Sequence, residues 1–142
     1  MKLNKDFVDK LRDSGLRPTK QRLKICEVLF NTEKTFHFTV NDLSKILCEN
    51  LEEKISLATI YNTVHAFKKK GYLKEISINS DKSYFDTNTS AHHHFYDEDN
   101  NKLIDCGEND IDSINVKNNI TGKKINSIEV LVKVASDNQN QN

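Results

Sequence analysis

The first half of the chain carries apolar residues that recur every three or four positions among polar ones. This spacing gathers the apolar side chains on one face of a helix, so it predicts amphipathic helices. In the last such stretch, Ile60, Val64 and Phe67 fall on one face and should point into a core. Four stretches show the pattern: 3–16, 19–31, 39–51 and 56–73.

Residues that begin and end helices stand at the edges of these stretches. Thr19, Thr39 and Ser56 precede the apolar stripes and can accept a hydrogen bond from the free backbone N–H groups of a first helical turn. Gly15 and Gly71 follow the stripes, where a left-handed residue commonly ends a helix. The first half should therefore fold as separate helices.

Two runs of strand character follow the helical stretches. They cover residues 73–79 and 82–87, and the turn-like sequence NSDK joins them. Three or four helices followed by a hairpin make a winged helix, which is a variant of the helix-turn-helix. The plainer alternative is a small helical domain whose exposed polar faces bind nothing.

The polar face of the stretch 56–73 suits a helix that reads DNA. Short polar side chains can reach base edges in the major groove, while lysines near the helix end can meet phosphates. The residues of this face are Thr59, Asn62, Thr63, Ala66, Lys69 and Lys70.

The net charge is zero, but it is unevenly distributed along the 142 residues. Residues 1–86 hold 16 Lys and Arg against 12 Asp and Glu, whereas residues 87–142 hold 5 against 9. A basic half joined to an acidic half is typical of a nucleic-acid-binding part next to a part with another task. Chance differences between two solvated surfaces would give the same numbers.

The composition excludes several classes of protein. No apolar run approaches the roughly 18 residues of a membrane span, and the polar start MKLNKDF is no signal peptide, so a cytoplasmic protein is expected. Cys26, Cys48 and Cys106 are far apart and form no C-x-x-C pair. Neither a disulfide framework nor a cysteine-rich zinc site is indicated.

Three of the five histidines stand in a row at residues 92–94, within the strand-compatible sequence HHHFY. Alternation along a strand puts His92 and His94 on one face and His93 on the other, so two of the three could bind one ion. The strand-like run KLID would bring Asp105 nearby. The alternative is a solvated histidine run without a ligand.

Three segments together resemble the ferric uptake regulator family: GLRPTKQRLKICEVL, ISLATIYNTVHAFKKKGYLKEI and SYFDTNTSAHHHFYDEDNNKLID. The resemblance covers about residues 7–106 and extends less firmly to INSIEVLVKVA. It implies a bacterial winged-helix repressor with a C-terminal dimerisation domain and metal-sensing sites. The wording YFDTNTSAHHHF resembles more narrowly the iron response regulator (Irr) branch, whose members are heme-responsive and lack the structural zinc of the family.

The departures from the family pattern agree with that branch. The first C-x-x-C pair of typical members would fall near Asp97 and Asn100, and a second pair is missing, so no structural zinc site made of four cysteines is expected. The segment that is helical in typical members, here residues 109–124, lacks a helical stripe. The Cys-Pro heme motif of some Irr proteins is also absent.

The resemblance also implies roles for individual residues. The metal site, for iron, manganese or zinc, would use His37, Asp86, His92, His94 and Asp105. The candidates for heme ligation are His92, His93, His94 and His65. DNA contacts would come from Arg17, Thr59, Tyr61, Asn62, Lys68, Lys69 and Lys70.

We therefore expect an α+β fold, with a winged-helix DNA-binding domain over residues 1–86 and a small α/β, mostly strand, dimerisation and sensing domain over 87–142. A disordered tail should begin at about residue 137, and the homodimer should form through residues 91–136. The expected function is sequence-specific transcriptional regulation of iron homeostasis through heme or a divalent metal. The alternatives are a metal-dependent repressor blind to heme and a metalloenzyme. No H-E-x-x-H motif or nucleophile with its base supports an enzyme.

Overall fold

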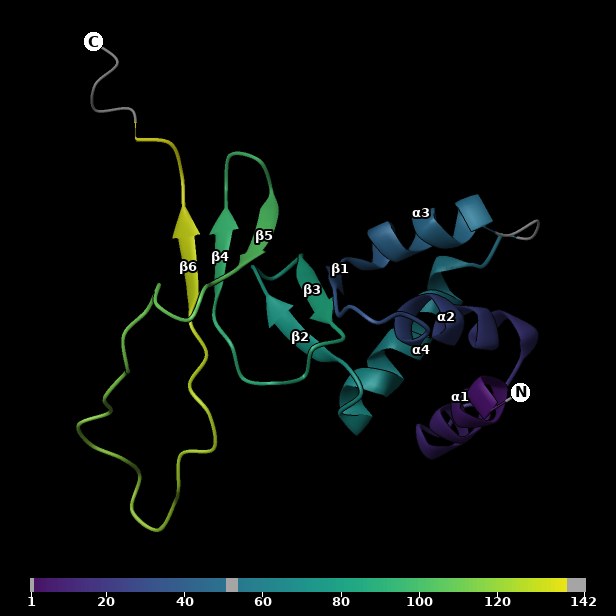
Figure 1. The fold of residues 1–142 in the computed structure, drawn as a ribbon, viewed down its shortest axis with the longest axis horizontal. Helices are drawn as coiled ribbons and strands as arrows, with labels where there is room; N and C mark the ends of the chain where they lie inside the picture. Colours follow the sequence, from purple (N-terminus) through teal and green to yellow (C-terminus); the bar gives the residue numbers. More distant parts are fainter. Residues whose placement is uncertain (1, 51–53, 138–142) are drawn as a thin grey trace. The chain divides into compact units, whose positions relative to one another are not determined.

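The computed structural model describes residues 2–50 and 54–137, and the chain divides into two compact units, Met1–Thr89 and Ser90–Asn142 (Figure 1). The division falls after residue 89, three residues beyond the expected boundary at residue 86. Thr87 belongs to the first unit because its backbone and its side chain form hydrogen bonds with Phe36. The expected tail beyond about residue 137 lies outside the described residues. None of the helices in the described ranges has the length and apolar character needed to cross a membrane.

The predicted helices form: α1 (Lys2–Asp13), α2 (Lys20–Phe30), α3 (Val40–Asn50) and α4 (Leu57–Lys70). The predicted caps are confirmed, since the side chains of Thr19 and Ser56 each accept a hydrogen bond from the backbone N–H three residues on. Thr39 and Asp42 exchange two such bonds at the start of α3. Gly71 ends α4 with φ 91°, a left-handed conformation that glycine adopts without strain.

The helices enclose one apolar core in the first unit. The predicted stripes are buried, and burial of each such side chain contributes about 1.5–3 kcal/mol. Val28 and Ile46 of the same stripes are only half-buried, whereas Cys26, which was not assigned to a stripe, is fully buried. Burial raises the pKa of the Cys26 thiol to about 12, so this cysteine acts as a small apolar side chain. The fully buried helical residues are Leu11, Ile25, Cys26, Leu43, Ile60, Thr63, Val64 and Phe67.

Two residues of α4 lie where their spacing does not predict. Thr63 was expected on the exposed face but is fully buried, and its hydroxyl donates to the carbonyl of Thr59 at 2.7 Å. It lies between Ile60 and Phe67 on the helix, and the internal hydrogen bond removes the cost of burying the hydroxyl. Leu57, three residues before Ile60, continues the apolar stripe but is 52% exposed.

A three-stranded antiparallel sheet of order β1-β3-β2 completes the first unit. The predicted hairpin is confirmed as β2 (Lys74–Ser77) and β3 (Ser83–Asp86), and the short β1 (His37–Phe38) pairs with the other edge of β3. The register sets His37 opposite Asp86 and Phe38 opposite Phe85. Four helices and this sheet form the predicted winged helix.

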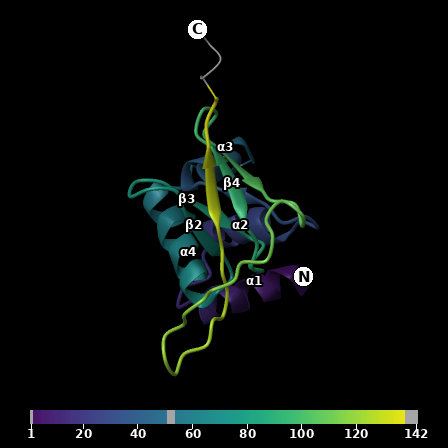
Figure 2. The same ribbon diagram turned by 90° about the vertical axis from the view of Figure 1, so that its left-hand side faces the viewer.

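The second unit is a three-stranded sheet of order β5-β4-β6. β4 (His94–Asp97) and β5 (Lys102–Asp105) form an antiparallel hairpin, and β6 (Leu131–Val134) runs parallel to β4. Residues 107–130 contain no helix or strand, and they form a long loop between β5 and β6 (Figure 2). The segment 109–124 is therefore not helical, as predicted.

Asp13, at the end of α1, contacts two residues at and just after the end of α4. Its carboxylate accepts a hydrogen bond from the Tyr72 hydroxyl at 2.5 Å and pairs with the Lys70 ammonium at 3.4 Å. The ammonium of Lys10 lies over the rings of Phe30 and Tyr72, at 3.8 and 4.7 Å from their centroids. The Tyr72 hydroxyl, followed by Lys70, lowers the pKa of Asp13 below its ordinary value.

Replacement of Asp13 by Asn should therefore lower stability in a pH-dependent way. A depressed pKa means that the carboxylate contributes stability above the unfolded-state pKa of about 4, and that this contribution is lost as the pH falls through the folded-state pKa. Chemical denaturation should show wild type more stable than Asp13→Asn at pH 7, with the difference shrinking below about pH 4. Asp9→Asn, an exposed carboxylate on the same helix, is the control; an equal, equally pH-dependent loss in both variants would contradict the assignment.

Candidate metal and nucleic-acid sites

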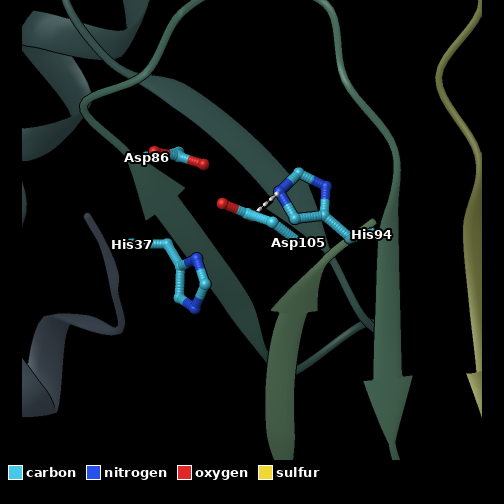
Figure 3. A group of neighbouring side chains, drawn as sticks. All are labelled: His37, Asp86, His94 and Asp105. Atoms are coloured by element: carbon cyan, nitrogen blue, oxygen red, sulfur yellow. Dashed lines mark ion pairs between the residues drawn. The ribbon is translucent and has the colours of Figure 1, made fainter. Parts of the chain in front are cut away.

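The first candidate ligand pair lies on the sheet of the first unit. His37 of β1 and Asp86 of β3 are register partners, so their side chains start from adjacent positions of two paired strands (Figure 3). Asp86 is only 2% exposed, and its Oδ1 accepts a hydrogen bond from the backbone N–H of Asn88 at 2.8 Å. Asp86 is thus a buried carboxylate at the position opposite a histidine, and both side-chain types are common metal ligands.

The second candidate pair lies on the sheet of the second unit. His94 of β4 and Asp105 of β5 are also register partners, with 3.1 Å between Nε2 and Oδ1 (Figure 3). His92 precedes β4, but its Nε2 reaches the same oxygen at 3.7 Å, and the two imidazole rings lie 4.3 Å apart. His94 is 4% exposed. The structure therefore gathers two imidazoles and one carboxylate in this unit, although His92 lies outside the strand on which the expected alternation was based.

The hydrogen bonds of His92 and His93 assign opposite tautomers. The Nδ1 of His92 lies 2.7 Å from the carbonyl of Ser90, which can only accept, so Nδ1 carries the proton. The neutral ring then has its lone pair on Nε2, next to Asp105, and can ligate a metal there. The Nδ1 of His93 instead accepts from the backbone N–H of Val130 at 2.9 Å, so its proton must be on Nε2. This bonding argues against His93 as a ligand of either a metal or heme.

A surface cavity of about 520 Å³ adjoins the histidines within the second unit. His92 and His93 line it together with Cys106, the acidic residues Glu108 and Asp112, and three isoleucines, Ile111, Ile114 and Ile128. An apolar wall beside an imidazole is what a planar, largely apolar cofactor such as heme requires. Burial, followed by the carboxylates of Asp110 and Asp105, raises the pKa of Cys106, which keeps the thiol protonated and makes it a poor ligand.

The expected DNA-binding residues of α4 differ in their exposure and in their hydrogen bonds. Tyr61 and Asn62 are exposed, and the hydroxyl of Thr59 is shared with the Ser56 side chain at 3.0 Å. Arg17, which precedes α2, is exposed. These side chains are accessible to a nucleic acid, with Thr59 the least free of them to turn outward.

The three lysines at the end of α4 differ in their partners. Lys68 pairs with Glu75 at 2.8 Å and Lys70 pairs with Asp13 at 3.4 Å. The Lys68 ammonium is the main cause of the lowered pKa of Glu75. Lys69 is exposed and pairs with no carboxylate in the part of the chain that the structure describes. The sequence alone gives the three lysines the same role, whereas the structure leaves Lys69 most available to a phosphate.

The exposed Leu57 and the bonding of His93 were not anticipated from the sequence. Leu57 lies in the first turn of α4, where an exposed apolar side chain can contact the methyl group of thymine. Its spacing from Ile60 predicts burial, so the sequence carried no signal for this exposure. His65, a heme candidate by sequence, lies on α4 with its ring against those of Tyr61 and Phe85.

Comparisons with known proteins agree with this architecture. The sequence profile of the ferric uptake regulator family matches residues 13–133. The peroxide operon regulator of Bacillus subtilis is 33% identical over 122 residues, which is 85% of this chain and 82% of the relative. Among solved structures, the Pseudomonas aeruginosa ferric uptake regulator with manganese covers 92% of this chain and 97% of its own, with a TM-score of 0.64 and 21% identity. The Vibrio cholerae ferric uptake regulator covers 89% of this chain and 98% of its own, with a TM-score of 0.63 and 26% identity.

The chain therefore belongs to the ferric uptake regulator family. Members of this family are metal-dependent transcriptional regulators that bind DNA as dimers, and they are not enzymes. The α+β fold class, with a DNA-binding and a dimerisation domain, is confirmed by the solved structures. The Bacillus subtilis relative and the Staphylococcus aureus repressor PerR, which is 34% identical over 100 residues, are both named for peroxide.

The bond between His93 and Val130 predicts a structural role for the middle histidine. His93→Ala should leave the Val130 N–H without its acceptor, at a cost of about 1–3 kcal/mol. Amide hydrogen exchange at Val130 should accelerate in His93→Ala and stay near the wild-type rate in His92→Ala. Unchanged protection of Val130 in His93→Ala would show that the ring is not the acceptor.

Proposed function

We propose that this protein is a DNA-binding regulator whose affinity for its operator is set by one divalent metal ion held by His37, Asp86, His92, His94 and Asp105. The observation that carries the proposal is the pair of cross-strand His–Asp partners, one on the sheet of each unit. The same two donor types recur at register positions of both sheets, and imidazole with carboxylate is a common donor set for a metal ion.

The donor set favours a first-row transition metal. Three imidazoles and two carboxylates suit iron, manganese or zinc with four to six ligands, whereas calcium and magnesium prefer oxygen donors alone. The carboxylate of Asp86 fits this role, because carboxylate oxygens are ligands for all three of these ions. His92 is already in the tautomer that leaves Nε2 as the ligating atom.

The source of the ligands explains how an ion would regulate DNA binding. His37 and Asp86 belong to the DNA-binding unit, and His92, His94 and Asp105 belong to the other unit. An ion that binds both sets stabilises one arrangement of the units over the others, and the difference in the ion's affinity for the arrangements sets how far the equilibrium moves. In a dimer this selects the separation of the two α4 helices, and DNA half-sites require a separation of about 34–36 Å.

Heme sensing, the finer prediction from the Irr-like histidine triplet, stands as a second candidate. The cavity lined by His92 and the three isoleucines supports it, since His92 could ligate heme iron through Nε2. His92 would then serve either heme or the metal ion, so the two ligands would compete. Peroxide is a third signal, suggested only by the names of the relatives.

The metal proposal predicts unequal effects within the triplet. His94→Ala should weaken metal binding about 10- to 100-fold and remove the metal dependence of operator binding, because a ligand and its partner Asp105 are both disturbed. The control is His93→Gln, whose side-chain carbonyl can still accept from Val130. Isothermal titration with Mn²⁺ and Zn²⁺, followed by DNA-binding titration, measures both effects.

Two results would separate the candidates. Equal losses in His94→Ala and His93→Gln would contradict the metal site. A Soret band that forms with hemin in wild type and in His94→Ala, but not in His92→Ala, would favour the heme candidate. Loss of operator binding after addition of peroxide to the metal-loaded protein would favour the peroxide signal.

The fourth helix predicts a distinction between specific and general DNA contacts. Tyr61→Ala should cost about 1–3 kcal/mol on the operator and little on unrelated DNA, as expected for a lost base contact. Lys69→Ala should weaken binding to all sequences and reduce the salt slope by about one. Fluorescence anisotropy on both DNAs at several salt concentrations provides the measurement. A change of sequence preference in Lys69→Ala would contradict the placement of α4 in the groove.

A further inference from the structure

The rings of Tyr61 and His65 are stacked on the exposed side of α4. Their centroids lie 4.1 Å apart with an interplanar angle of 36°. The two residues are four positions apart, which brings side chains together on the surface of a helix. Tyr61 is 52% exposed, and His65 is half-buried beneath it. In the described part of the chain, His65 is the aromatic residue that the Tyr61 ring contacts.

The His65 ring is itself supported by the core. It meets the ring of Phe85 edge to face, at 5.5 Å between centroids and an interplanar angle of 74°. Phe85 is 2% exposed and lies in the middle strand of its sheet, opposite Phe38 on one side and Glu75 on the other. A ring that is packed in the core has little freedom to move. His65 therefore connects a fixed ring to an exposed one.

Charged groups surround this stack without forming part of it. Glu75, opposite Phe85 on β2, pairs with Lys68 at 2.8 Å, and its carboxylate is close enough to His65 for their charges to interact. Lys69 and Lys70 follow on α4 and line a surface hollow of about 600 Å³ together with His65 and Asp13. Removal of the imidazole could thus act through packing or through charge, and the test must separate the two.

We propose that His65 is a positioning residue for DNA recognition, which holds the Tyr61 ring in the orientation that the operator requires. This inference rests on the proposed role of Tyr61 in DNA binding. An exposed tyrosine loses rotational freedom when it is clamped against DNA, and this loss opposes binding. A ring that is already stacked has lost part of that freedom before DNA arrives, so the stack raises operator affinity without a contact from His65 itself.

Other roles of His65 lead to different expectations. A direct contact between His65 and DNA would not depend on Tyr61. If His65 acts through its charge, a variant that keeps a flat ring but has no ring nitrogens, such as His65→Phe, should lose the effect. A role in folding alone would lower stability and leave the DNA affinity of the folded protein unchanged. Only positioning requires that the effect of His65 vanish when Tyr61 is absent.

The test is a double-mutant cycle on the metal-loaded full chain, with operator and unrelated DNA measured by fluorescence anisotropy. The variants are Tyr61→Ala, His65→Ala and the double mutant. His65→Ala should lower operator affinity about 3- to 10-fold in the wild-type background and less than about 2-fold in the Tyr61→Ala background. Affinity for unrelated DNA and the salt slope should not change.

Two further variants make the outcome specific to the ring. His65→Phe keeps a flat ring against Phe85 and should restore operator affinity to within about 2-fold of wild type. His65→Leu keeps apolar packing without a flat ring; it should fold if His65→Ala does not, and it should show the same loss of affinity. Thermal denaturation confirms that each variant is folded at the temperature of the binding assay.

Several results would overturn the inference. An equal loss from His65→Ala in both backgrounds would show that His65 touches DNA itself. Failure of His65→Phe to restore affinity would show that charge matters, not the ring. An unaltered affinity in both His65→Ala and His65→Leu would show that the stack does not assist binding. A Tyr61→Ala variant with full operator affinity would overturn both the inference and the proposed role of Tyr61, whereas the other three results leave that role intact.

Discussion

The pairing of β3 on both of its edges is the constraint on which the first unit depends. β2 alone would leave the wing as an isolated hairpin, and two-stranded hairpins are marginally stable in water. The two residues of β1 close the other edge and carry the chain from α2 to α3. The same register sets His37 opposite Asp86 and Phe38 opposite Phe85. One short strand pairing therefore places His37 beside Asp86 and Phe38 beside Phe85.

The sequence predicted the helices of the first unit well because two independent signals agreed there. Apolar stripes gave the buried faces, and Thr19, Ser56 and Gly71 gave the ends. It did not predict β1, since two residues are too few to show alternation. It also misplaced Thr63, because a threonine that bonds to its own helix can be buried at little cost. Tertiary packing decided these positions.

The candidate site could be predicted as a set of residue types, but not as a set of bonds. His92 and His94 do lie together, as alternation predicted, but His92 and His93 precede β4, so the alternation of a strand does not account for their positions. The distinct role of His93 depends on Val130, which is 37 residues away in the chain and joins only when β6 lies beside β4. Likewise, the three consecutive lysines of α4 differ only because Glu75 and Asp13 come from other elements. Contacts between residues distant in sequence carry this information, and no local pattern records them.

The sheet of the second unit buries few of its side chains, whereas the register of β3 in the first unit tolerates no shift. Among the described residues of the second unit, Tyr96, Leu103 and His94 are buried, which is a small core for a separate unit. In β3, neighbouring side chains point to opposite faces, so Phe85 and Asp86 would exchange faces if the strand slipped by one residue. An insertion or deletion within residues 83–87 would thus put a carboxylate where the Phe85 ring now packs and a ring opposite His37. A change of length in the turn at residues 79–82 would not exchange the faces of Phe85 and Asp86. Over evolutionary time the wing can therefore lengthen or shorten at its tip, while its base keeps a constant length.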